Sequence, residues 1–182
     1  MKIVLVSNTY TPHVGGVARS VAAFREEYLR TGHDVLVVAP AFAGQPEREE
    51  GVIRIPALQN FNASDFSVAL PLPNGLKSTL EEFSPDLIHS QHPFLLGMTA
   101  FRAARMLQRP IVFTHHTLYE EYTHYVPVDS PALKSFVIEL ATCYANLVDL
   151  VIAPSESIRG ILLERGVQTP LEVIPTGVYV ER

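Results

Sequence analysis

The chain has a single cysteine and no cluster of basic residues. Cys143 is the only cysteine among 182 residues, so the chain forms no internal disulfide bond and no cysteine metal cluster. Because Cys143 falls on the apolar side of a helical pattern, we predict a small buried side chain. The net charge is -5 and Lys and Arg form no run. This disfavours a nucleic-acid partner, since such binding relies on basic patches.

Long hydrophobic segments are also missing. The first apolar run extends only from Ile3 to Val6 before Ser7 and Asn8. This run is too short for the core of a signal peptide or for a membrane span. We therefore expect a cytoplasmic protein, or one that touches a membrane only peripherally, from its inner face.

The motifs of several common enzyme classes do not occur. The first loop has two adjacent glycines where a dinucleotide site needs G-x-G-x-x-G, and the second predicted strand ends without an acidic residue for a ribose. There is no P-loop motif, no serine in G-x-S-x-G and no pair of carboxylates at the strand ends. Nicotinamide and flavin enzymes, P-loop proteins, hydrolases with a catalytic triad and glycosidases are therefore disfavoured.

Short β-branched segments alternate with longer amphipathic segments, which predicts an α/β protein. Strands are predicted at residues 3–7, 35–39, 52–55, 87–90, 111–114, 150–153 and 171–174. Helices are predicted at residues 17–31, 76–83, 94–107, from 130 to about 147, and from 155 or 157 to about 165. Residues 57–73 read as irregular. Nearly continuous apolar strands indicate one Rossmann-like, doubly wound parallel sheet with helices on both faces.

Ligands of such sheets bind beyond the carboxyl ends of the strands. Polar and imidazole side chains gather in the segments that follow the predicted strands. His89, His92 and the pair His115-His116 are candidate ligands for a zinc site. However, His89 lies inside an apolar strand, and no Asp or Cys stands nearby in sequence to complete a ligand set. We therefore expect no metal.

Gly15 and Gly16 precede a helical pattern and allow two interpretations. Without side chains, the backbone can approach an oxyanion closely, and the first N–H groups of a helix are unpaired and partly positive. The glycines would then belong to a phosphate site. Alternatively, they form a structural turn that needs positive φ. The glycines alone do not separate these interpretations.

The strand at 111–114 is followed by His115, His116 and Thr117. Successive strand residues point to opposite faces, so only one of the two histidines can face the strand-end crevice together with Thr117. A neutral imidazole there can bind a hydroxyl or move a proton, or it is a structural loop residue. The tyrosines and glutamates of 118–127 suit either a sugar or an interface, and the weakly charged loop 61–73 suits a membrane lip, an acceptor lid or ordinary packing.

Several segments together resemble a known family. In order along the chain they read NTYTPHVGGV, GHDV, DLIHSQ, FTHHT, APS and VIPTGV. This ordered set is similar to the N-terminal half of retaining, GT-B fold glycosyltransferases, the nucleotide-sugar family that includes lipid mannosyl- and glucosyltransferases. The resemblance covers essentially the whole chain. It implies two Rossmann-like lobes, with the active site between them.

The resemblance implies roles for particular residues. Gly16 would offer its N–H to the donor diphosphate, with Gly15 permitting the approach, and His116 would bond a hydroxyl of the transferred sugar. The acceptor and sugar pocket is assigned to Tyr10, Thr117, His92 and Tyr125. The donor is expected to be a UDP- or GDP-sugar, with no metal and no other cofactor.

The resemblance also implies how the chain is organised. Residues 1–175 would form the acceptor lobe and residues 176–182 the start of an interlobe linker, with the donor lobe not included. We expect transfer with retention to a sugar or lipid acceptor such as diacylglycerol, and an isolated lobe that is inactive. Two alternatives stay open: a sugar-nucleotide epimerase of the same two-lobed fold, and a stand-alone lipid- or carbohydrate-binding module.

Overall fold

The structure is a computed structural model that describes residues 1–58, 68–69, 75–125 and 130–177. The loop at 61–73, which suits a membrane lip, an acceptor lid or ordinary packing, lies outside this range, apart from residues 68 and 69. Residues 178–182 of the expected linker also lie outside it.

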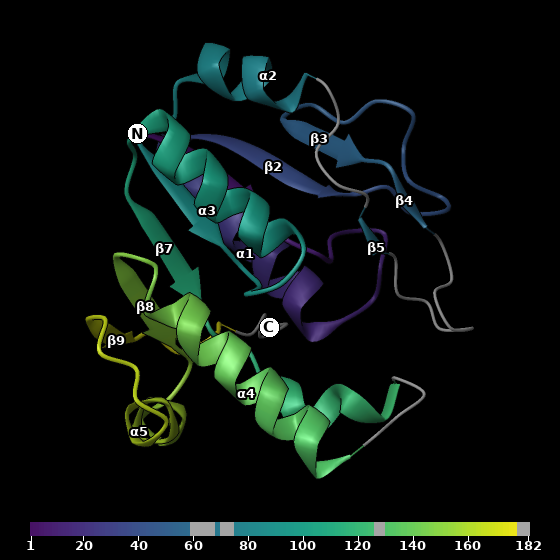
Figure 1. The fold of residues 1–182 in the computed structure, drawn as a ribbon. Coiled ribbons are helices and arrows are strands. Elements are labelled where there is room, and N and C mark those ends of the chain that lie inside the picture. The colour runs from purple at the N-terminus through teal and green to yellow at the C-terminus, as the bar shows by residue number, and fades with distance from the viewer. Residues whose placement is uncertain (59–67, 70–74, 126–129, 178–182) are drawn as a thin grey trace, which may run out of the picture.

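Seven strands form one parallel sheet, as the apolar segments predict (Figure 1). The strand order is β3-β2-β1-β6-β7-β8-β9. The bounds of these strands are Lys2–Val6 (β1), Asp34–Pro40 (β2), Val52–Ile55 (β3), Leu87–Ser90 (β6), Ile111–Thr114 (β7), Leu150–Ala153 (β8) and Leu171–Val173 (β9). A two-stranded antiparallel ribbon, β4 (Ala57–Leu58) with β5 (Val68–Ala69), lies in the stretch that we expected to be irregular.

Helices cover both faces of the sheet, which confirms the Rossmann-like, doubly wound class. The helices are α1 (Gly16–Arg30), α2 (Leu76–Phe83), α3 (Leu96–Leu107), α4 (Pro131–Ala145) and α5 (Glu156–Glu164), with a 3₁₀ helix, η2 (Tyr119–Tyr125), before α4. One apolar core lies between the sheet and α1, and a larger one between the other face and α2 to α5. Burial of these two cores is the main source of stability.

Local signals set several helix ends. The Ser130 and Ser155 side chains accept hydrogen bonds from the backbone of Leu133 and Ile158. Ser130 therefore caps α4 as predicted, and of the two candidates for α5, Ser155 and Ser157, it is Ser155 that caps the helix. After α1 the chain turns through Gly32, whose φ of +84° favours glycine.

The start of α3 differs from the prediction. It begins at Leu96 and not at Phe94, because Leu95 has a φ of +51°, outside the helical region. The Leu96 N–H donates to the side chain of Asn8. A tertiary contact therefore decides where this helix begins.

The predicted burial of α4 is partly wrong. Cys143, for which we predict a buried side chain, is exposed, and the apolar residues Phe136, Leu140 and Leu147 of the predicted helix are also exposed. The helix buries Tyr144, as its apolar pattern predicts, together with Ala141 and Ala145. Because α4 is apolar over much of its circumference, periodicity does not select a face.

Candidate active site at the carboxyl edge of the sheet

The carboxyl ends of β1, β6 and β7 meet at one edge, because these strands are neighbours in the sheet. The segments that follow them, residues 7–16, 91–95 and 115–118, include no Asp, Glu, Lys or Arg. Their polar groups are amides, hydroxyls and imidazoles. These three segments are therefore polar but carry no fixed charge of their own.

The N-terminus of α1 opens at this edge. Gly15 is the N-cap residue with a φ of -168°, which is extended backbone, and neither Gly15 nor Gly16 has positive φ. No side chain caps this helix among the described residues. A Cβ added to Gly16 would meet nothing within 4 Å, whereas one added to Gly15 would lie 3.1 Å from Nε2 of His13. The turn interpretation that requires positive φ is therefore wrong, and the space beside Gly16 is open.

His116 is the histidine of the pair that faces this edge. Its ring is half-buried, and Nε2 lies 2.7 Å from Oε1 of Gln91, a fully buried residue that follows β6. Burial, with a smaller effect from neighbouring His115, lowers the pKa of His116 to about 4. The imidazole is therefore neutral near pH 7 and can accept a hydrogen bond.

His92 is held by the first loop. The Asn8 N–H donates to Nδ1 of His92 over 3.1 Å, and the Asn8 side chain bonds the backbone of Phe94 and Leu96. Burial, and second the charge that His116 would bear, lower the pKa of His92 to about 3. The loop that follows β1 thus holds the imidazole ring of His92, which follows β6.

Two further hydrogen bonds hold the β6–α3 turn in place. The Ser90 hydroxyl donates to the His92 carbonyl over 2.9 Å, and the Tyr144 hydroxyl lies 2.9 Å from the Gly97 carbonyl. A Cβ on Gly97 would lie 1.9 Å from the His92 carbonyl oxygen, so only glycine fits there. The turn that presents His92 is therefore built to a fixed shape.

His89 and His115 lie in the interior. His89 faces α1, where its Nε2 is 2.7 Å from Oγ1 of Thr114, and burial lowers its pKa to about 3. His115 is 1% exposed, and its ring packs edge-on against Phe113 and Tyr119. Both rings are therefore buried. Among the described residues, no group of three or more His, Cys, Asp or Glu side chains could hold a metal ion.

The remaining predicted pocket residues lie in different environments. Thr117 is half-buried beside His116. Tyr10 is 4% exposed in the core under α1, with the Arg54 guanidinium 5.4 Å from its ring centre. Tyr125 ends η2, and its side chain lies outside the described part of the structure. The pocket roles of these residues stay predictions. The sequence assigns no role to Asn8 or Gln91, although Asn8 lies two residues after β1 and Gln91 directly follows β6.

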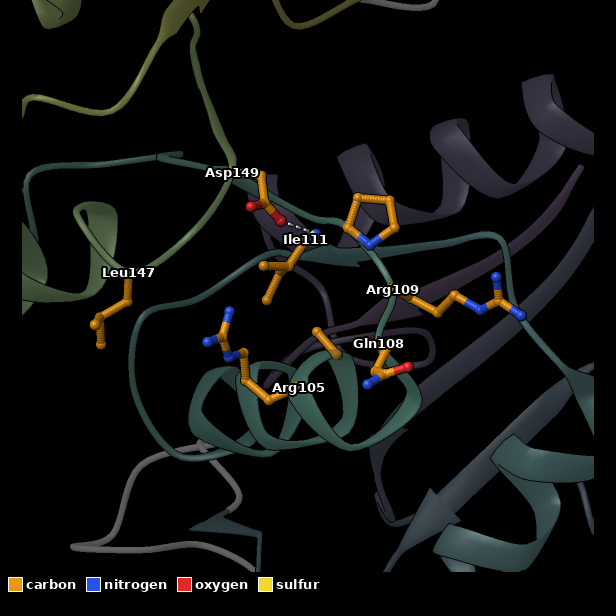
Figure 2. Close-up of a pocket in the computed structure, with 8 residues that line it drawn as sticks. Arg105, Gln108, Arg109, Ile111, Leu147 and Asp149 are labelled. Atoms are coloured by element: carbon orange, nitrogen blue, oxygen red, sulfur yellow. Dashed lines mark hydrogen bonds between the residues drawn. The ribbon is translucent and has the colours of Figure 1, made fainter.

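A cavity lies at the opposite edge of the sheet (Figure 2). It has a volume of about 550 Å³, and Arg105, Arg109, Leu147 and Asp149 are among its lining residues. Asp149 there accepts a hydrogen bond from the backbone N–H of Ile111, the first residue of β7. Because this is the amino edge of the sheet, the cavity is separate from the candidate site.

The family profile described as Glycosyltransferase Family 4 matches residues 14–182. The chain belongs to glycosyltransferase family 4. It is 35% identical over 186 aligned positions to an alpha-monoglucosyldiacylglycerol synthase of Streptococcus pneumoniae, covering 100% of this chain and 42% of that protein. It is 35% identical over 123 positions to a GDP-mannose-dependent alpha-mannosyltransferase of Corynebacterium glutamicum, covering 64% of this chain and 29% of that protein.

Solved structures share the fold of this family 4 chain. A sucrose-phosphate synthase of Thermosynechococcus elongatus superposes with a TM-score of 0.66 at 19% identity, covering 97% of this chain and 48% of that one. A UDP-GlcNAc 2-epimerase of Methanocaldococcus jannaschii has a TM-score of 0.56 at 13% identity, covering 95% and 45% of the two chains. These likenesses confirm the predicted Rossmann-like lobe of the GT-B type. The chain spans less than half the length of the relatives that it matches.

Proposed function

We propose that the chain is the acceptor-binding lobe of an enzyme that moves a sugar, with retention, from a UDP- or GDP-sugar to an acceptor. Membership of glycosyltransferase family 4 supports the reaction class. The observation that supports the site is the neutral His116, held by Gln91 at the same edge as the open N-terminus of α1. An imidazole acceptor and free backbone N–H groups suit a sugar hydroxyl and a phosphate.

The composition of the edge supports a shared site. A donor diphosphate has at least two negative charges, and the strand-end segments described above offer no Lys or Arg to balance them. We propose that a second lobe supplies the basic groups and the contacts to the nucleotide. In this proposal Gly16 and His116 lie on one side of a cleft, and the second lobe forms the other side.

The chemistry proposed for this lobe uses no carboxylate nucleophile and no metal. In the proposed reaction the departing diphosphate takes the acceptor proton while His116 orients the sugar. The buried Glu120 is paired with Arg165 over 2.5 Å, which suits a structural role. The protein's residues therefore bind and orient, in line with catalysis by positioning.

For the acceptor we propose a glycerolipid such as diacylglycerol. This proposal is supported by the names of two similar proteins, from Streptococcus pneumoniae and Acholeplasma laidlawii, both alpha-monoglucosyldiacylglycerol synthases. No helix in the described residues is long and apolar enough to cross a membrane. We propose a peripheral contact with the inner face of the membrane as the route to such an acceptor.

The test is an assay of the longer protein that includes both lobes. UDP-glucose and GDP-mannose would each be incubated with and without diacylglycerol, and products identified by mass spectrometry and anomeric NMR. We expect an α-glycosylated lipid with one donor. Conversion of the donor sugar without acceptor would instead indicate an epimerase, and lipid binding without turnover would indicate a binding module. The 182-residue chain alone should show no turnover.

A further inference from the structure

The side chain of Gln91 is buried at the candidate site. The proposed reaction assigns this side chain no contact with substrate. It is fully buried directly after β6, and its Oε1 lies 2.7 Å from Nε2 of His116. Its Nε2 is buried and has no hydrogen-bond partner among the described residues. Burying an amide N–H without a hydrogen-bond partner costs free energy of folding. The hydrogen bond to His116 is therefore a reason for Gln91 to occupy this buried position.

This contact fixes the proton on the His116 ring. The Gln91 carbonyl oxygen can only accept, so Nε2 of His116 must be the donor and must hold the proton. In a neutral imidazole the other nitrogen, Nδ1, then has a free lone pair. The imidazoles of His89, His92 and His115 lie close enough to His116 for a charge on one ring to affect the other.

His92 is fixed in the same tautomer by a different contact. Its Nδ1 accepts the Asn8 N–H, so its proton also lies on Nε2. The two rings consequently offer opposite groups. His116 offers an acceptor, Nδ1, and His92 offers a donor, Nε2–H. Neither of these atoms has a partner among the residues that the structure describes.

We propose that Gln91 is a positioning residue that holds His116 in the Nε2–H tautomer, so that Nδ1 accepts a hydrogen bond from a ligand hydroxyl. That the hydroxyl belongs to a sugar rests on the proposed function. Gln91 itself does not touch the ligand. It sets the hydrogen-bond polarity of the site, in the way that partners of metal-bound histidines set their tautomer and orientation.

The first experiment reads the tautomer directly and needs no activity. Long-range ¹H–¹⁵N spectra of the 182-residue chain at neutral pH should show His116 protonated on Nε2. Gln91→Glu should keep this tautomer, because a carboxylate also accepts, and should raise the pKa of His116. Gln91→Leu should release the ring into a mixture of tautomers. Gln168→Glu and Gln168→Leu, at an exposed position beside the amino edge, are the matched controls.

Two results would overturn the proposal. One is a wild-type His116 protonated on Nδ1, which would mean that the amide N–H faces the ring. The other is a Gln91→Leu chain that is folded, by circular dichroism and thermal melting, and keeps the wild-type tautomer. If Gln91→Leu does not fold, the wild-type spectrum and Gln91→Glu still decide the question.

The second experiment uses the longer protein and separates this proposal from the proposed function. Gln91→Leu should lower kcat/KM by about 10- to 100-fold. It should cause no further loss when His116→Ala is already present, since both changes remove one interaction. Gln91→Glu should move the acidic limb of the pH profile to higher pH. Fully additive losses would overturn the role of Gln91. A protein without transferase activity would refute the proposed function, while the tautomer measurement would still test Gln91.

Discussion

The two edges of the parallel sheet use polar side chains in opposite ways. At the amino edge, exposed carboxylates bond the first N–H of a neighbouring strand: Asp86 accepts from Lys2 and Asp149 accepts from Ile111, each over 2.8 Å. At the carboxyl edge the corresponding groups are neutral, namely Asn8, Gln91 and the histidines.

The difference follows from solvation. A carboxylate at the amino edge stays in water while it accepts a hydrogen bond from the first N–H of a strand, so its charge is not desolvated. The carboxyl edge is partly buried, and there ionised groups would be costly without partners. Neutral amides and imidazoles can bind in such a place, and burial keeps the imidazoles neutral. The contrast predicts that changes at the carboxyl edge affect function, whereas changes at the amino edge affect only stability.

The largest effect is expected from His116→Ala in the longer protein. Loss of one preorganised hydrogen bond to the reacting sugar should lower kcat/KM by about 100-fold or more, with little change in folding. His33→Ala, at the amino edge, is the matched control. Steady-state assays with the accepted donor would measure both variants. Wild-type rates in His116→Ala would remove the difference between the edges.

Two glycines of the carboxyl edge should behave in opposite ways. Gly97→Ala places a Cβ against the His92 carbonyl oxygen and should destabilise the fold by about 3 kcal/mol. Gly16→Ala meets no neighbour and should stabilise it by about 0.5 kcal/mol, yet weaken donor binding in the longer protein. Urea unfolding and donor titration would measure these effects. Equal destabilisation by both substitutions would contradict the open space at Gly16.

Acid should destabilise the fold through the buried imidazoles. The pKa of His89 is about 3 in the fold against about 6.5 unfolded, so below about pH 6.5 the unfolded chain binds a proton that the fold does not. Stability is then lost as the pH falls, by about 2 kcal/mol between pH 7 and about pH 5 for this ring. Urea unfolding of wild type and His89→Asn at both values tests this. An identical pH dependence in the two chains would refute it.

The smallest effect is expected at the amino edge. Asp149→Ala removes the acceptor of the Ile111 N–H at an exposed position, where water can replace it, and should cost about 1 kcal/mol. Transferase activity of the longer protein should not change. Thermal melting and the standard assay measure the two quantities. A clear loss of activity would show that the amino edge also contributes to the reaction.

Strands were the easiest elements to predict. Four of them, Val52–Ile55, Leu87–Ser90, Ile111–Thr114 and Leu150–Ala153, match the predicted bounds, because buried parallel strands are short apolar runs with clear ends. The face of α4 was not predictable in the same way. Cys143 and Phe136 are exposed because a helix that is apolar on two sides has no single favoured stripe.

The candidate site was predictable in position but not in its connections. Gly16 and His116 follow strands, so the rule for parallel sheets locates them. The partners Gln91 and Asn8 could not be assigned, because their bonds join segments that are far apart in the sequence. Asn8 and Leu96, for example, are 88 positions apart.

The sequence by itself determined the class of this protein: the alternation of apolar strands and amphipathic helices, the glycine-bearing first loop and the ordered segments of a glycosyltransferase. These are local patterns, because each one depends on residues that are neighbours in the sequence. Only the tertiary structure decided which histidines are buried in the core, which one faces the edge, and which residue holds the ring of His116. Those properties depend on burial and on single hydrogen bonds between distant segments, which exist only once the sheet has brought its strand ends together.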